Sequence, residues 1–171
     1  MNPFVLRCRT WIAGTMGAAV LVAGALGVGS VGFGQDASAP PKEIIFARKI
    51  LMDSINDNMD DLEAMVAQGK IDLNEGKPHS NIVSVMLMAF PHLFPPATND
   101  WKPGGNRDPG TDTFAAPEVW TNYADFYKRA KDASEIAFKA SRAGTEAAFK
   151  DQIGQLRIAC DSCHGIYLKK E

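Results

Sequence analysis

Apolar side chains recur every three or four positions between residues 42 and 68, as they do on one face of an α-helix. The stripe consists of Ile45, Arg48, Met52, Ile55, Met59, Leu62 and Val66. This spacing is typical of the buried seam of a helical bundle. Arg48 is the charged member of the stripe, so its side chain either reaches from the edge of the seam to water or binds an acidic group inside the fold.

A second helix is predicted over residues 78–94, after a polar connection at residues 70–77. Pro78 fits the first turn of this helix, and Pro91 is expected to end or kink it. The apolar positions expected to face the core are Ile82, Val85, Met86, Ala89, Phe90 and Leu93.

Two more helices are predicted, one over residues 117–144 and one from Thr145, its expected N-cap, to the C-terminus. Residues 91–116 are rich in proline and glycine. A connection of this length in a compact domain needs a role or a packed conformation. Trp101 and Phe114 give it apolar area to bury, so we expect an ordered crossover loop.

Four amphipathic helices without a strand pattern predict an all-α fold, an antiparallel four-helix bundle over residues 40–171. The chain has 171 residues, of which 46% are hydrophobic, and a net charge of −2. These values predict a single folded domain and give no indication of a nucleic-acid partner.

The last predicted helix contains Cys160-Asp161-Ser162-Cys163-His164, the C-x-x-C-H attachment signature of c-type haem. Positions i, i+3 and i+4 share one helix face, so both thiols and the imidazole can meet one porphyrin. The thiols add across the vinyl groups, and the imidazole takes an axial position on the iron. Zinc needs about four ligands, and the remaining cysteine, Cys8, lies far away in the sequence. A redox dithiol would be expected near a βαβ pattern, which is absent from the sequence.

Residues 1–39 are typical of a secretory signal, with Arg7 and Arg9 followed by a long uncharged run. Cleavage is expected after Gly34 or after Ala39. The run is also long enough to span a bilayer, so an uncleaved anchor, and with it a membrane attachment, remains open. Covalent haem attachment in bacteria takes place outside the cytoplasmic membrane, so the sequence predicts a periplasmic protein.

A four-helix chain with its haem motif in the last helix resembles the cytochrome c′ family. Two further segments carry the resemblance: Arg48-Lys49-Ile50-Leu51-Met52 in the first helix, and Pro117-Glu118-Val119-Trp120 at the start of the third. In high-spin members, the residue four positions after the first-helix arginine is often leucine, and the open iron binds NO or CO. In a low-spin subclass this residue is methionine, which closes the sixth position.

The resemblance therefore implies one haem c whose iron is bound by His164 and Met52, with Cys160 and Cys163 as attachment points and Arg48 on a haem propionate. Other side chains remain open as the sixth ligand: Met59, Met86, His79 and His92. Methionine ligation raises the reduction potential relative to two histidines.

The function expected from these residues is one-electron transfer, not enzymatic turnover, because no histidine or arginine stands out as a distal acid or base. The alternative is a five-coordinate, high-spin protein that binds NO or CO. The expected partners are redox proteins of unknown identity and a second copy of the chain, since many family members form homodimers through their first helices.

Overall fold

The structure, a computed structural model, describes residues 39–104, 108 and 112–169. The predicted export signal at residues 1–39 lies outside this part of the chain apart from Ala39, and so does Cys8. No helix of the described part is long and apolar enough to cross a membrane.

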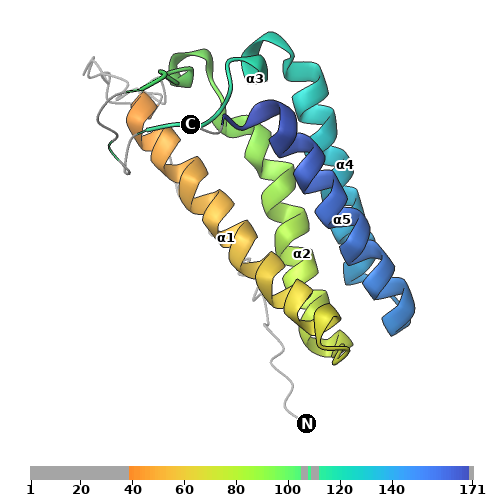
Figure 1. Cartoon of the computed structure of the whole chain (residues 1–171). Helices are drawn as coiled ribbons and strands as arrows, with labels where there is room; N and C mark the ends of the chain where they lie inside the picture. Colours follow the sequence, from red (N-terminus) through yellow and green to blue (C-terminus); the bar gives the residue numbers. More distant parts are fainter. Residues whose placement is uncertain (1–38, 105–107, 109–111, 170–171) are drawn as a thin grey trace, which may run out of the picture. The chain divides into compact units, whose positions relative to one another are not determined.

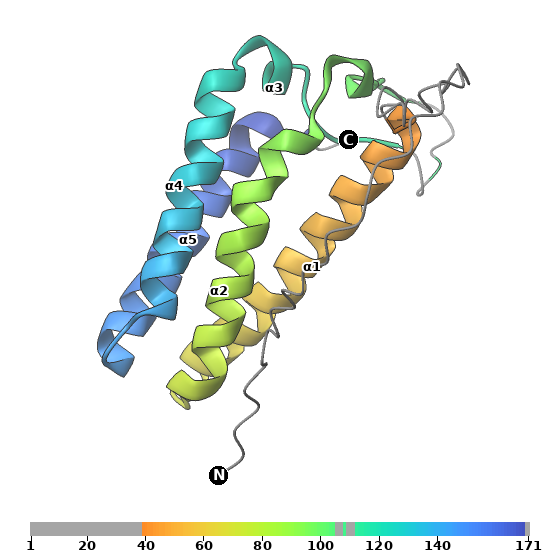
Figure 2. The same ribbon diagram turned by 180° about the vertical axis from the view of Figure 1, so that it is seen from behind.

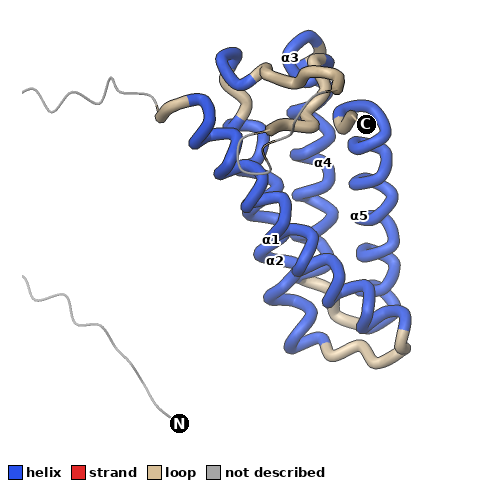
Figure 3. Tube along the Cα trace, turned by 60° about the vertical axis from the view of Figure 1, so that its left-hand side comes forward, coloured by secondary structure: helices blue, strands red, loops and turns tan. Residues whose placement is uncertain are grey.

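The described residues fold into four long helices that alternate in direction and lie along one another (Figures 1 and 2). These are α1 (Pro41–Ala67), α2 (Leu73–Ala89), α4 (Tyr123–Ser141) and α5 (Glu146–Tyr167). Three short elements join them: the 3₁₀ helices η1 (Phe90–Leu93) and η2 (Pro96–Thr98), and α3 (Glu118–Thr121). Figure 3 shows the loops gathered at the two ends of the helices. The predicted all-α, antiparallel four-helix bundle is confirmed.

The predicted seam of α1 faces the interior. Ile45, Ile55, Met59 and Leu62 are buried, and they are joined there by Arg48. The α2 helix packs along α1 on one side and α4 on the other, and α4 packs along α5. Because α1 and α5 touch much less, the side of the bundle between them is the open one.

The prediction for the second helix was wrong about its start. The α2 helix begins at Leu73, five residues before Pro78, so this proline lies inside the helix and not in its first turn. The cause is Asp72, whose Oδ1 accepts a hydrogen bond from the backbone N–H of Asn74 at 2.8 Å. An aspartate at the N-cap satisfies backbone donors that the first helical turn leaves unpaired. Pro91 does act as predicted, because the α-helix ends at Ala89 and a 3₁₀ turn follows.

The buried face of α2 also differs from the prediction, since Ile82 and Val85 are 40% and 63% exposed. The residues that face the core are mostly small: Gly76, Ser80, Val83, Ser84 and Leu87. The hydroxyls of both serines have partners: Ser80 Oγ donates to the carbonyl oxygen of Gly76 at 2.9 Å, and Ser84 Oγ lies 3.2 Å from Ser134 Oγ on α4. Small side chains let neighbouring helices approach closely, and a pattern of apolar residues alone does not reveal such a face.

Gly76 of α2 lies close to a side chain of α5. A Cβ atom added there would lie 2.5 Å from Cζ of the fully buried Phe149 of α5. We expect Gly76→Ala to lower the free energy of unfolding by about 1–2 kcal/mol, because overpacking outweighs the better helix propensity of alanine. Denaturant unfolding measures the change. Gly154→Ala is the matched control, since nothing lies within 4 Å of its added Cβ, and it should stabilise the protein by about 1 kcal/mol. Equal effects of the two substitutions would contradict the close approach.

The third predicted helix is interrupted once, at Asn122, where the backbone leaves the helical region between α3 and α4. The fourth is as predicted, because Thr145 Oγ1 accepts from the backbone N–H of Ala148 at 3.2 Å and α5 starts at the next residue. The end of the crossover loop is tied to the end of α5. Ala116 N–H donates to the carbonyl oxygen of Tyr167, and Lys169 N–H donates to that of Phe114, each at 2.8 Å.

Candidate haem site

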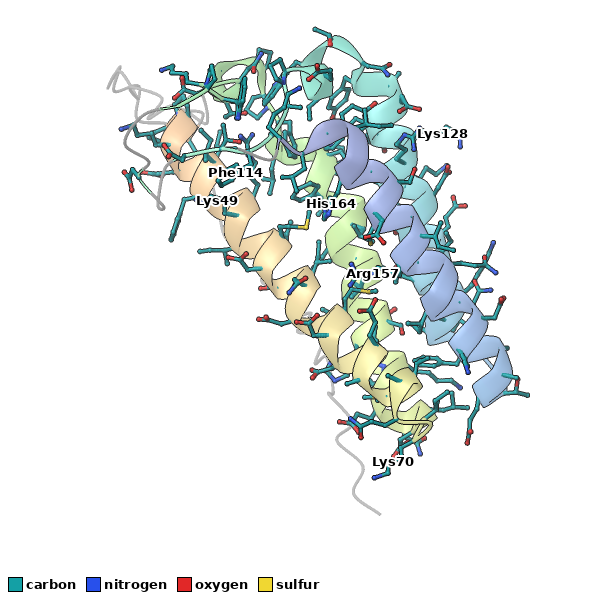
Figure 4. The ribbon with its side chains drawn as sticks, viewed as in Figure 1. Lys49, Lys70, Phe114, Lys128, Arg157 and His164 are labelled. Atoms are coloured by element: carbon teal, nitrogen blue, oxygen red, sulfur yellow. The ribbon has the colours of Figure 1, made fainter. Side chains whose placement is uncertain are left out.

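A cavity of about 570 Å³ lies between α1, α4, α5 and the end of the crossover loop. Its volume is within the range of roughly 300–1,000 Å³ that drug-sized ligands and cofactors occupy. The five residues that the sequence predicts for the site all line it: Arg48, Met52, Cys160, Cys163 and His164. In Figure 4, His164 of α5 and Lys49 of α1 lie on either side of the opening between these two helices.

The α5 wall carries the haem motif. Cys160, Cys163 and His164 are all partly buried and all line the cavity, so the helix brings the three side chains to one face as their spacing predicts. Neither cysteine forms a disulfide. Burial raises the pKa of both thiols, that of Cys163 to about 11, so at neutral pH they are protonated.

The α1 wall carries Met52, which is partly buried and lines the cavity from the side opposite the motif helix. Met59 lies two turns further along the same helix and also lines the cavity, at 2% exposure. The other candidates for the sixth ligand lie elsewhere: Met86 packs in the core, His79 Nδ1 is 2.8 Å from Asn58 Oδ1, and His92 stacks edge-on against Tyr127. Of the candidates for the sixth ligand, Met52 and Met59 therefore are the two that line the cavity.

Arg48 is buried at 3% exposure, so its side chain does not reach water as one of the two interpretations supposed. Its Nη1 donates to Thr98 Oγ1 at 2.9 Å and its Nη2 to Thr113 Oγ1 at 2.6 Å. The guanidinium also lies over the ring of Phe94, 4.5 Å from its centroid. Burial lowers the pKa of Arg48 to about 10, which leaves it a cation at neutral pH. The cation is thus held between α1 and the crossover loop, at the wall of the cavity.

Three further cations line the cavity: Lys49 of α1, Arg129 of α4 and Arg157 of α5. The two arginines were not predicted from the sequence. Arg157 forms an ion pair with Glu63 of α1, which joins α5 to α1 below the motif. Figure 4 shows Arg157 on the side of α5 that faces α1. Arg157 could have been predicted at the cavity, because it lies three residues before Cys160 and residues at that spacing share a helix face.

The remaining lining is mostly apolar. Its members include Ile55, Leu87, Phe90, Phe94, Val119, Phe126, Ala130 and Ala133. This is the lining that a flat hydrophobic macrocycle requires, with the sulfur and nitrogen donors on α1 and α5 and arginines among the lining residues. The residues present therefore fit a haem that is attached from α5.

Known proteins with a similar sequence or fold agree with this geometry. The family model described as Cytochrome C' matches residues 43–167. The chain belongs to the cytochrome c′ family. As a member, it carries one covalently attached haem c with its iron.

Two curated relatives and two solved structures show how close the similarity is. The chain is 31% identical to cytochrome c-554 of Cereibacter sphaeroides over 98 residues, which cover 56% of this chain and 60% of that protein. It is 29% identical to cytochrome c-556 of Agrobacterium tumefaciens over 131 residues, or 72% and 95% of the two chains. The fold is similar to that of cytochrome c′ from Thermochromatium tepidum, with a TM-score of 0.69, 24% identity, and coverage of 78% of this chain and 100% of the other. A cytochrome c′ described by its ligand-controlled dimer dissociation aligns with a TM-score of 0.66, 23% identity and the same coverage.

Proposed function

We propose that this member of the cytochrome c′ family is a periplasmic one-electron carrier whose haem iron is bound by His164 and Met52. The observation that carries the proposal is that these two side chains line one cavity from different helices, α5 and α1. Imidazole and thioether are a ligand pair that c-type haem uses for electron transfer. Cys160, one turn before His164, and Cys163, next to it in the sequence, supply the two thioether links.

Each side chain has a separate task in this proposal. The bound haem supplies the redox chemistry, because its iron takes up and releases one electron. His164 and Met52 would hold the iron from α5 and α1, and a ligand pair that is already in place would need little rearrangement on reduction. Arg48 is a buried cation, and the hydroxyl oxygens that accept its hydrogen bonds are neutral. A haem propionate would compensate its charge. Phe94 and Phe126, both buried, keep water away from the ring.

A five-coordinate iron that binds NO or CO is the second candidate, and membership of the cytochrome c′ family is what favours it. It would require the thioether of Met52 to stay off the iron. The two candidates differ in the sixth position alone, so CO distinguishes them.

The partners are proposed with the function: redox proteins that give and take the electron, and a second copy of the chain. The homodimer is supported by large apolar side chains exposed on the first two helices, namely Phe46, Ile50, Ile82 and Val85. Pairing of two copies through these side chains would remove apolar area from water.

A potentiometric titration under CO-free conditions, followed by addition of CO, tests the electron-carrier function. We expect one reversible transition with the slope of a single electron, and a reduced spectrum that CO leaves unchanged, because both axial positions are filled. A reduced protein that binds CO promptly and stoichiometrically would favour the gas-binding candidate and overturn this proposal.

A further inference from the structure

An ion pair on α4, formed by Arg129 and Asp125, contacts the haem motif. Arg129 lines the cavity, and its Nε donates to Asp125 Oδ2, one turn earlier on α4, at 2.6 Å. Its Nη1 crosses to α5 and donates to Ser162 Oγ at 2.9 Å. Ser162 lies between Cys160 and Cys163 in the sequence, so this bond holds the motif itself to α4.

The carboxylate of the same pair is bound to α5 a second time. Tyr167 is buried, and its hydroxyl donates to Asp125 Oδ2 at 2.6 Å while it accepts from Asn122 Nδ2 at 3.2 Å. The Tyr167 ring packs edge-on against Phe126 of α4, with 5.2 Å between the centroids. Ser162 and Tyr167 lie two residues before and three residues after His164. The pair therefore fixes α5 on both sides of the proposed iron ligand.

The two charged groups differ in their place relative to the cavity. Arg129 lines it, whereas Asp125 is not among the lining residues. Both groups are charged at neutral pH: the hydrogen bonds from Tyr167 and Arg129 hold the pKa of Asp125 below its usual value, and the bond to Asp125 raises the pKa of Arg129. The positive charge of the pair thus lies at the wall of the cavity.

A cation next to a redox centre favours the state with the added electron. Ferric haem carries one more positive charge than ferrous haem, so a fixed positive charge destabilises the ferric form more. The effect is stronger where apolar groups surround the site than in bulk water. Reduction transfers one electron from an external redox partner to the iron, and no bond to this pair forms or breaks.

We propose that Asp125 and Arg129 are positioning residues for the haem-binding turn of α5, and that the cation of Arg129 raises the reduction potential of the haem. The inference deepens the proposed electron-carrier function and rests on it, because it concerns the potential at which the carrier works.

Two charge-removing substitutions, Arg129→Gln and Asp125→Asn, separate electrostatics from loss of packing. The reduction potential of each purified holoprotein is measured by spectroelectrochemistry. Arg129→Gln removes a positive charge and should lower the potential, whereas Asp125→Asn removes a negative charge and should raise it. The second shift should be the smaller one, since Arg129 lines the cavity and Asp125 does not. If the pair only holds α5 in place, both substitutions loosen the same contact and shift the potential in the same direction.

Two further variants act as controls. Arg129→Lys keeps the cation and should keep the potential near that of the wild type, even if it weakens the bond to Ser162. Lys128→Gln breaks an exposed pair of the same spacing on α4, with Asp132, and should leave the potential unchanged. The proposal is supported if Arg129→Gln and Asp125→Asn shift the reduction potential in opposite directions and the two control variants leave it unchanged. Shifts of the same sign, or the same potential in all four variants, overturn it.

The optical spectrum of each reduced protein reports the ligation of the iron, whereas the potential shifts report the role of the ion pair. The test of this inference is therefore separate from the test of the proposed function. A wild-type protein with a five-coordinate iron would refute the His164 and Met52 ligation, yet the sign of the two shifts would still decide the role of the pair. Conversely, a low-spin wild type whose potential does not respond to either substitution refutes the role of the pair alone.

Discussion

Replacing Met52 with leucine is expected to open the sixth position of the haem iron. Leucine has nearly the volume of methionine, so the packing of α1 should survive at a cost below about 1.5 kcal/mol, but it has no sulfur to donate. The reduced protein should become high-spin and five-coordinate and bind CO. Its reduction potential should fall, because the thioether ligand that raises the potential is lost. Optical spectra with and without CO, together with a potentiometric titration, measure all three changes.

Met59→Leu is the matched control for this substitution. Met59 lines the same cavity from the same helix, two turns away, so the two variants make the same chemical change at neighbouring positions. We expect Met59→Leu to leave the low-spin spectrum intact. An unchanged spectrum in Met52→Leu combined with a high-spin spectrum in Met59→Leu would assign the ligand to Met59.

Substitution of Arg48 by methionine should lower the free energy of unfolding by about 2–4 kcal/mol. Methionine replaces the buried stem of the side chain but removes the hydrogen bonds of the guanidinium to Thr98 and Thr113. Thr98 Oγ1 still donates to the carbonyl oxygen of Pro95, and Thr113 Oγ1 still accepts from the Ala115 N–H, so the cost is that of the lost bonds. A hydrogen bond from a charged donor contributes about 1.5–3 kcal/mol. The contact between α1 and the crossover loop should weaken without these bonds, and denaturant unfolding of the holoprotein measures the loss.

Arg48→Lys separates the charge of Arg48 from its hydrogen bonds. A lysine keeps the cation but cannot make the forked contacts of a guanidinium with two threonines. If Arg48 serves a haem propionate, Arg48→Met should lower the reduction potential and Arg48→Lys should largely keep it, while both lose stability. A potential that is the same in the wild type and in Arg48→Met would show that Arg48 only holds the crossover loop.

The first and last helices could be predicted because their signals are local. The α1 seam follows one period over 27 residues, and Thr145 caps α5 as its position suggests. The predicted start of α2 was wrong because it rested on Pro78 alone. Pro78 fits a first turn, but the cap at Asp72 decides the start, and a proline can lie inside a helix when tertiary packing supports it.

The buried face of α2 could not be read from apolar periodicity. Ser80, Ser84 and Gly76 face the core because close helix contacts need small side chains, and a hydropathy pattern counts such residues as polar. The apolar residues that were expected there, Ile82 and Val85, face outward instead.

The candidate site also contains residues that local sequence predicts and residues whose place depends on tertiary packing. Cys160, Cys163 and His164 are adjacent in the sequence, so their common face follows from helix geometry alone. That Met52 lies in the same cavity depends on how α1 packs in the bundle, and the resemblance to cytochrome c′ supplied that expectation. The threonines that bind Arg48 lie 50 and 65 residues away from it, and no local pattern joins such residues.

The optical spectrum of the reduced, purified protein tests the central claim most directly. If His164 and Met52 both bind the iron, the spectrum shows the sharp, separated α and β bands of low-spin haem, and CO does not change them. A single broad band that sharpens on addition of CO would show an open iron and contradict the proposed electron carrier.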